Sequence, residues 1–130
     1  MPDNELSELA KKGQLKDKRV LVAQFERMVE DPKFSRFIKS FADQWLSLSL
    51  INATSPDDVL YPEFDTWLME SMPKETYAYL AEMVKQNLGA EALVRSDFLM
   101  INERLARHYR IAGVEGDEIR SVQIGEGIRG

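Results

Sequence analysis

The sequence predicts an all-α fold, a bundle of four to five main helices followed by a Gly-rich C-terminal tail that has room for one short strand. Between residues 18 and 109, apolar side chains recur every three to four positions, which is typical of helices with one buried face. A strand-like pattern appears only near the end of the chain, at Ile119, Val122 and Ile124. Five glycines lie at or after residue 113, where they disfavour regular structure.

The first main helix is expected over residues 18–30. Leu21, Phe25 and Met28 lie on one face of it, and Asp17 stands where an N-cap is needed. An acidic cap followed by a helical apolar pattern predicts a clean helix start.

The second helix is expected to follow at once. Asp31 caps it, Pro32 occupies its first turn, and the pattern continues to about Leu48. Residues 49–61 contain several turn formers and are expected to form a loop. The apolar positions of this helix predict a deeply buried face: Phe34, Phe37, Ile38, Phe41, Trp45 and Leu48.

The third helix is expected to start at Pro62 and to bury Trp67 and Leu68. Pro73 interrupts its pattern, since proline lacks an N–H and pushes the preceding residue away from helical angles. The sequence therefore predicts a break or kink near Ser71.

Two more helices complete the pattern. A fourth helix should run from Pro73 to Leu88, with Gly89 as its stop signal. A fifth should begin after Ser96 or Asp97. Its expected apolar residues are Met100, Ile101, Leu105 and Tyr109.

This scheme divides the chain into an N-terminal extension (1–17), a helical domain (18–112) and a tail or linker to a missing downstream domain (113–130). A strand in the tail has no visible partner, so we expect residues 113–130 to be poorly anchored. The core is expected to contain eight apolar residues: Phe34, Phe37, Phe41, Trp45, Trp67, Leu80, Val84 and Leu105.

The composition excludes several kinds of site. The chain has 130 residues, 44% of them apolar, which is enough to bury a core without disulfides. It has no cysteine, so disulfides, thiolate metal sites and covalently attached c-type haem are excluded in this chain. A net charge of −5 argues against nucleic-acid binding, despite the basic stretch from Lys11 to Arg19. No apolar run approaches the ~20 residues of a transmembrane segment.

Five polar residues are candidates for chemistry: Glu63, Asp65, Asn102, Glu103 and His108. Glu63 and Asp65 point about 200° apart on a helix, so they suit compensation of the helix dipole better than acid–base catalysis. Asn102 and Glu103, together with Arg104, suit a buried polar network that positions the helix against the preceding loop better than a binding site. His108 could be an axial ligand of non-covalent haem or a cation at a helix C-terminus, and the second is favoured. We therefore assign no catalytic, cofactor-binding or metal site to this chain.

Two segments carry a resemblance to a known family. Residues 60–65 and 97–109 resemble an uncharacterised helical domain, a domain of unknown function found in planctomycete-type secreted, cytochrome-like multidomain proteins. Residues 31–46 are similar to the start of that domain, and the resemblance covers roughly residues 27–125. In that family a glycine usually follows the tyrosine of the second segment. This chain has Arg110 there, so we expect the turn to differ.

The resemblance implies a context rather than a reaction. Such domains occur in large polypeptides with export signals, so the expected location is extracytoplasmic, either periplasmic or secreted. A c-type haem belongs to a separate domain with a Cys-x-x-Cys-His motif, so no cofactor is expected in this chain. The expected partners are neighbouring domains of the same polypeptide. No catalytic residue is established for the domain, and none is transferred.

Two function classes remain open. The first is a non-catalytic structural or interaction module within a larger exported, cytochrome-associated protein. The second is part of a multidomain enzyme, such as a polysaccharide-directed hydrolase, whose site forms between this domain and its neighbours. Convergence of Asp57, Asp58, Glu63 and Glu103 in one cleft would favour the enzyme. The loop from residue 52 to residue 61 is where we expect a neighbouring domain to dock.

Overall fold

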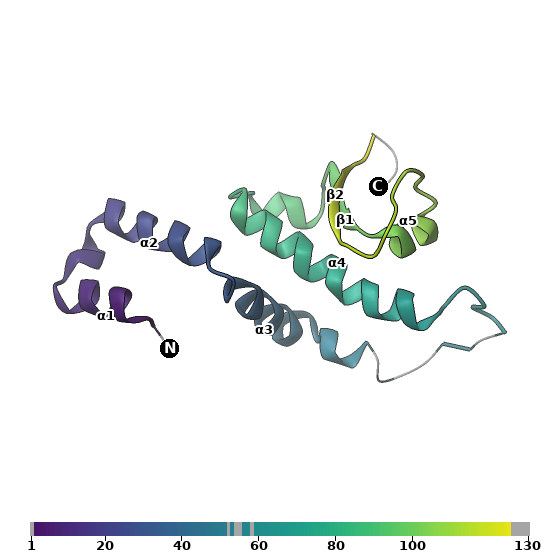
Figure 1. The fold of residues 1–130 in the computed structure, drawn as a ribbon, viewed down its shortest axis with the longest axis horizontal. Coiled ribbons are helices and arrows are strands. Elements are labelled where there is room, and N and C mark those ends of the chain that lie inside the picture. Colours follow the sequence, from purple (N-terminus) through teal and green to yellow (C-terminus); the bar gives the residue numbers. More distant parts are fainter. Residues whose placement is uncertain (1, 52, 54–55, 58, 126–130) are drawn as a thin grey trace. The chain divides into compact units, whose positions relative to one another are not determined.

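The computed structural model describes residues 2–51, 53, 56–57 and 59–125 (Figure 1). Within these residues it has five α-helices and a two-stranded antiparallel sheet, which confirms the expected helical fold class with a short strand near the C-terminus. None of the helices described is both long enough and apolar enough to cross a membrane. The chain divides into two compact units, Met1–Phe34 and Ser35–Gly130, and each is considered by itself.

The first unit contains two helices joined by a short 3-10 turn. Asp17 caps the second helix as expected, because its Oδ1 accepts a hydrogen bond from the Arg19 amide at 2.8 Å. Gly13 reverses the chain with a φ of 68°, a left-handed conformation that glycine adopts without strain. An ion pair of 2.7 Å between Arg27 and Asp3 ties the helices together. The elements are α1 (Asn4–Lys11), η1 (Gln14–Lys16) and α2 (Lys18–Glu30).

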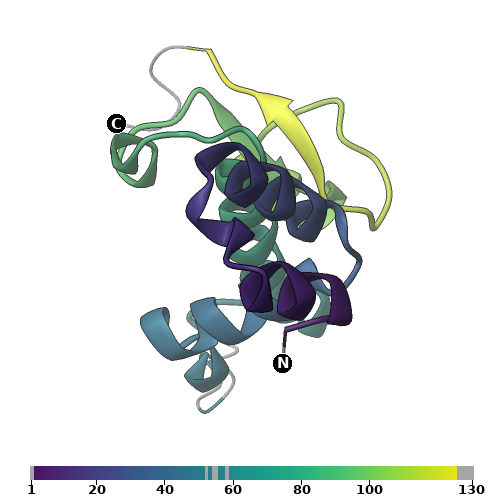
Figure 2. The ribbon, with the colours of Figure 1, turned by 90° about the vertical axis from the view of Figure 1, so that its left-hand side faces the viewer.

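The second unit packs α4 (Thr66–Lys85) and α5 (Glu103–Tyr109) against a small sheet of β1 (Phe98–Ile101) and β2 (Arg120–Gln123). The strands β1 and β2 run antiparallel, with Leu99 opposite Val122, and Figures 1 and 2 show them side by side. The remaining elements are α3 (Phe34–Leu46), η2 (Leu48–Leu50) and η3 (Ala90–Leu93). The buried core cluster of this unit consists of Leu68, Leu99, Ile101, Leu105, Ala106 and Val114.

The predicted helix start at Pro62 is wrong, and of the predicted break or kink near Ser71 the break does not occur. Asp65 is the N-cap of α4, and the helix continues without interruption through Pro73. A proline in a helix interior costs about 3 kcal/mol, but packing of both halves of the helix can offset that cost. The residues that α4 buries lie on both sides of the proline: Leu68, Ser71, Leu80 and Met83.

The predicted stop of this helix at Gly89 is also wrong. The helix ends at Lys85, and Asn87 takes the left-handed conformation, with a φ of 51°. The Leu88 amide then donates to the carbonyl of Met83 at 2.9 Å, which completes a Schellman motif. Asparagine tolerates this conformation better than most other residues, so it serves as the stop signal here.

The fifth predicted helix begins too early. Met100 and Ile101 belong to β1, and the helix starts only after its cap Asn102. A run of four apolar residues does not distinguish a strand from a buried helix segment. Residues 98–101 form a strand because they pair with β2.

The described part of the tail is anchored, contrary to expectation. Strand β2 has β1 as its partner, and the Ile124 amide donates to the carbonyl of Asp97 at 2.8 Å. Val114 is only 8% exposed and belongs to the core. Ile119 and Val122 pack against that core. The expectation failed because the partner strand was assigned to a helix. Residues 126–130 lie outside the described residues.

The predicted core is right for Leu80 and Leu105 and wrong for much of α3. The buried residues of α3 are Ile38 and Ala42, whereas its aromatic stripe is largely exposed. A helical stripe predicts an amphipathic helix, but it does not reveal what covers the stripe. Three of the predicted core residues are only half-buried: Phe34, Trp67 and Val84. Three others are exposed: Phe37, Phe41 and Trp45.

Candidate functional site

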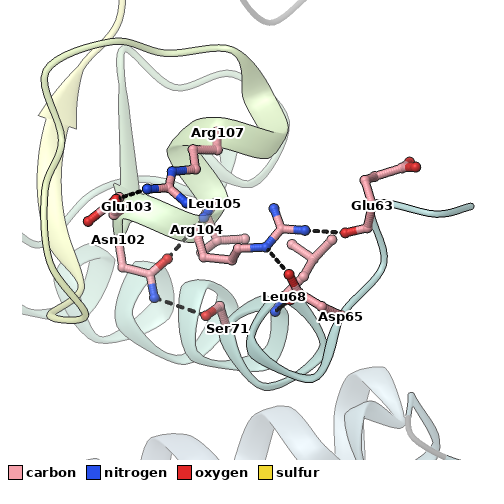
Figure 3. Close-up of polar contacts among 9 residues, drawn as sticks. All are labelled: Glu63, Asp65, Leu68, Ser71, Asn102, Glu103, Arg104, Leu105 and Arg107. Carbon is pink, nitrogen blue, oxygen red and sulfur yellow. Dashed lines mark hydrogen bonds and ion pairs between the residues drawn. The ribbon is translucent and has the colours of Figure 1, made fainter.

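A polar network connects the N-terminal ends of α4 and α5 (Figure 3). Asp65 caps α4, with its Oδ1 accepting from the Leu68 amide at 2.7 Å. Asn102 caps α5, with its Oδ1 accepting from the Leu105 amide at 3.0 Å. Each cap satisfies an amide that has no partner within its own helix, so both helix starts are fixed by polar side chains.

Asn102 is the buried centre of the network. Its side chain is inside the protein, with 1% of the residue exposed, and its Nδ2 donates to the Ser71 hydroxyl at 2.9 Å. The same nitrogen lies 3.4 Å from the carbonyl oxygen of Asp117. Asn102 therefore links α5, the second turn of α4 and the loop before β2.

Arg104 clamps the segment that leads into α4. The residue is 7% exposed, and its Nε donates to Asp65 Oδ2 at 2.8 Å. Its Nη2 donates to the backbone carbonyl of Glu63. The Leu68 amide first, and then the Arg104 guanidinium, hold the pKa of Asp65 below its ordinary value. A buried guanidinium with two acceptors thus fixes residues 63–65 in place.

Glu103 fastens the loop between α5 and β2. Its Oε2 accepts from the Gly116 amide at 2.8 Å, and its own amide donates to the Gly116 carbonyl at 3.0 Å. Its Oε1 accepts from Arg107. The Gly116 amide, followed by Arg107, lowers the pKa of Glu103. Gly116 has a φ of 85°, which explains the glycine at this position.

The structure brings three of the five sequence-predicted candidates into this network: Asp65, Asn102 and Glu103. Glu63 contributes only its carbonyl oxygen, and Figure 3 shows its carboxylate pointing away from the other labelled side chains. His108 is exposed in the last turn of α5, outside the network.

The sequence pattern did not indicate one member of the network, Ser71, or the acceptors of Arg104. Ser71 is fully buried and pairs with Asn102, and Arg104 forms the clamp. Arg104 was expected in a polar network with Asn102 and Glu103 and is found in it, but its acceptors at residues 63 and 65 were not anticipated. No local pattern singled out Ser71, because its partner is 31 residues away.

The polar network is suited to fixing backbone segments in place rather than to acid–base chemistry. The carboxylates of Asp65 and Glu103 are both engaged by structural donors. Asp57 accepts hydrogen bonds from two backbone amides in its own turn, and Asp58 lies outside the described residues. Across the part of the chain that the structure describes, no three His, Asp or Glu side chains gather in a way that could hold a metal ion.

The clamped segment leads back to a turn with exposed apolar side chains. Asp57 Oδ1 accepts from the amides of Val59 at 2.8 Å and Leu60 at 3.0 Å, which is an Asx-type turn. The side chains presented there are 86% exposed for Val59, 72% for Leu60 and 53% for Tyr61. Phe64 then packs against the core. A turn held at both ends therefore displays three apolar residues, which we call the docking turn.

Comparison with known proteins yields one match. A family model described as "Protein of unknown function (DUF1592)", with the short name PSD4, matches residues 1–111. No curated protein and no solved structure matches the chain. The matched segment contains α1 to α5 and β1 and ends before β2.

Proposed function

This chain belongs to the DUF1592 family of proteins of unknown function, and from that premise we propose that it is a non-catalytic helical module for structure and interaction within a larger polypeptide. The observation that carries the proposal is the docking turn, residues 59–61, which exposes three apolar side chains in succession. Neighbouring exposed apolar residues are typical of surfaces that contact another protein.

The site geometry supports this role. A binding loop works best when a rigid scaffold positions it, and the buried Arg104 clamp fixes the residues just after the docking turn. Asp57 fixes its beginning through two backbone amides. The polar network therefore serves to present the docking turn to a neighbouring domain of the same polypeptide.

The wider context is part of the same proposal. We infer a polypeptide of planctomycete type that is exported to the periplasm or secreted, and that is associated with a cytochrome. Its c-type haem would lie in another domain, and this chain would bind no cofactor. The support is the resemblance of residues 60–65 and 97–109 to domains found in such proteins, together with the absence of cysteine here.

The alternative, part of a multidomain enzyme such as a polysaccharide-directed hydrolase, finds less support. It needs carboxylates that converge on a cleft. In the network, Asp65 and Glu103 are instead occupied by cap and loop amides, and the Glu63 carboxylate points away.

The substitution Leu60→Asp in the full-length polypeptide tests the proposal, with Val94→Asp as the matched control. Both positions are exposed, at 72% and 92%, so each change should alter the stability of the isolated chain by no more than about 0.5 kcal/mol. In the full-length protein, only Leu60→Asp should increase the rate of proteolysis between domains and separate their calorimetric transitions. Equal behaviour of the two full-length variants would refute docking through this turn.

A further inference from the structure

Helix α3 carries a row of exposed aromatic side chains. Phe37, Phe41 and Trp45 follow one another at intervals of four residues and are 59%, 44% and 51% exposed. The ring centroids are 6.1 Å apart for the first pair and 5.4 Å apart for the second. These three residues form a continuous ridge along the helix, which we call the aromatic ridge.

The ridge borders a hole with the geometry of a helix-packing site. A depression of about 430 Å³ is lined by Phe37, Ser40, Phe41, Gln44 and Trp45. The first four of these residues stand at i, i+3, i+4 and i+7. That is the set of four that surrounds a side chain inserted from a facing helix. The depression is shallow and open, and a large side chain from a second helix fits into it.

The charges of α3 indicate which helix fits and in which direction. Lys33 precedes the helix and Arg36 lies in its first turn, where no acidic residue is present. Its last turn contains no basic residue. Asp31 precedes the helix and its carboxylate accepts from the Lys33 amide at 2.7 Å, whereas the C-terminal end of the helix dipole has no compensating cation. A second α3 in the antiparallel direction places basic residues beside the other C-terminus, whereas a parallel copy places like charges together.

We propose that the aromatic ridge is a self-association surface, on which α3 of a second copy of this chain packs antiparallel about a two-fold axis at Phe41. In that register Phe37 faces Trp45 of the partner subunit, and the two Phe41 rings meet at the axis. The contact is isologous, because each copy supplies both the ridge and the hole.

The size of the ridge sets the strength of the association. From the exposed fractions, the three aromatic side chains offer roughly 300 Å² per copy. Stable interfaces bury about 800 Å² per partner. The dimer is therefore weak and concentration-dependent. It involves residues other than the docking turn, so it stands apart from the proposed function.

Sedimentation velocity of the full chain between about 10 µM and about 1 mM measures the association. Phe41→Glu and Trp45→Glu, each checked for retained helicity by circular dichroism, should weaken it by about 30-fold or more. Val94→Glu, at an exposed apolar position elsewhere, should leave it unchanged. A wild-type chain that stays monomeric throughout, or aromatic variants that associate like the wild type, would overturn the proposal.

Cross-linking tests the direction of the pairing, since the chain has no native cysteine. Ser40→Cys lies one residue from the proposed axis and should link to its copy through a short bis-maleimide. Lys33→Cys lies eight residues from the axis, so the two copies of it would be about 24 Å apart along the helix and should not link. Linking of Lys33→Cys would disprove the antiparallel arrangement, because only a parallel pair brings its two copies together.

Discussion

The side-chain amide of Asn102 performs two tasks that are usually separate. Its oxygen caps α5, and its nitrogen binds the buried Ser71 hydroxyl of α4. A cap contributes about 1 kcal/mol, and a buried polar group left without its partner costs about 1–3 kcal/mol. The free energy of unfolding should therefore depend strongly on this one side chain.

We predict that Asn102→Ala lowers the free energy of unfolding by about 2–4 kcal/mol, measured by urea denaturation. Ser71→Ala should cost less, because it leaves the cap intact. The double variant should be less destabilised than the sum of the two single changes, since both remove the same hydrogen bond. If the destabilisation of the double variant equals the sum of the two single changes, the side chains of Asn102 and Ser71 do not stabilise each other.

Acid should weaken the clamp at Asp65. The pKa of this carboxyl is lowered in the fold, mainly by the Leu68 amide and then by Arg104, so folding favours the ionised form. Its contribution is complete above the ordinary aspartate pKa and is lost as the pH falls through the lowered value. We predict that unfolding free energies measured from about pH 6 to about pH 2 fall less steeply in Asp65→Asn, which keeps the cap oxygen. If the unfolding free energy of Asp65→Asn falls with pH as steeply as that of the wild type, Asp65 does not contribute to the loss of stability in acid.

Arg110 occupies a position where glycine is favoured. It ends α5 with a φ of 60°, and the Ile111 amide donates to the Ala106 carbonyl at 2.8 Å. Side chains other than glycine pay about 1–2 kcal/mol for the left-handed conformation. We predict that Arg110→Gly raises the free energy of unfolding by about 1 kcal/mol and the melting temperature with it. Arg107→Gly, inside the same helix, is the matched control and should lower both.

At the scale of elements, local signals predicted helix starts better than they predicted strands. Asp17 was identified as a cap from its position alone, because a cap depends on neighbours within three residues. Strand β1 was assigned to a helix because its partner lies about 20 residues further along the chain. The continuity of α4 through Pro73 could not be predicted either, since packing on both sides of the proline decides it.

Adjacent residues of β2 provide a matched test of the sheet. Val122 faces the core, whereas Gln123 is exposed. We predict that Val122→Asp lowers the free energy of unfolding by about 2 kcal/mol or more, because it places a charge against apolar residues. Gln123→Asp should cost at most about 1 kcal/mol. Similar thermal shifts for the two variants would show that β2 does not pack as described.

At the scale of the whole molecule, the fold class followed from composition and periodicity, but the placement of the core did not. Leu105 is buried as expected, whereas Trp45 is exposed. Both fit the same helical pattern, and only tertiary contacts distinguish them. For the candidate site, Asp65 and Asn102 were identified as polar candidates but not as caps, because both helix starts were predicted too early. Arg104 was expected in a polar network, but its acceptors were not, because they lie about 40 residues away.

We predict that the isolated chain binds no haem. His108 is exposed in the last turn of α5, beside Arg107 and Arg110, whereas a haem ligand needs an enclosed apolar pocket. Titration with haemin should give no sharp Soret band at one equivalent, and His108→Ala should give the same spectra. A stoichiometric band that disappears in His108→Ala would reverse this conclusion.

The pairing of β1 with β2 has a consequence for how the chain is made. A ribosome releases residues 98–101 well before residues 120–123, and at about 5–20 residues per second the delay is about 1–4 s. During that interval Leu99 and Ile101, which are buried in the finished fold, have no partner strand. The nascent chain therefore passes through a stage with an open, apolar strand edge, which chaperones are suited to protect.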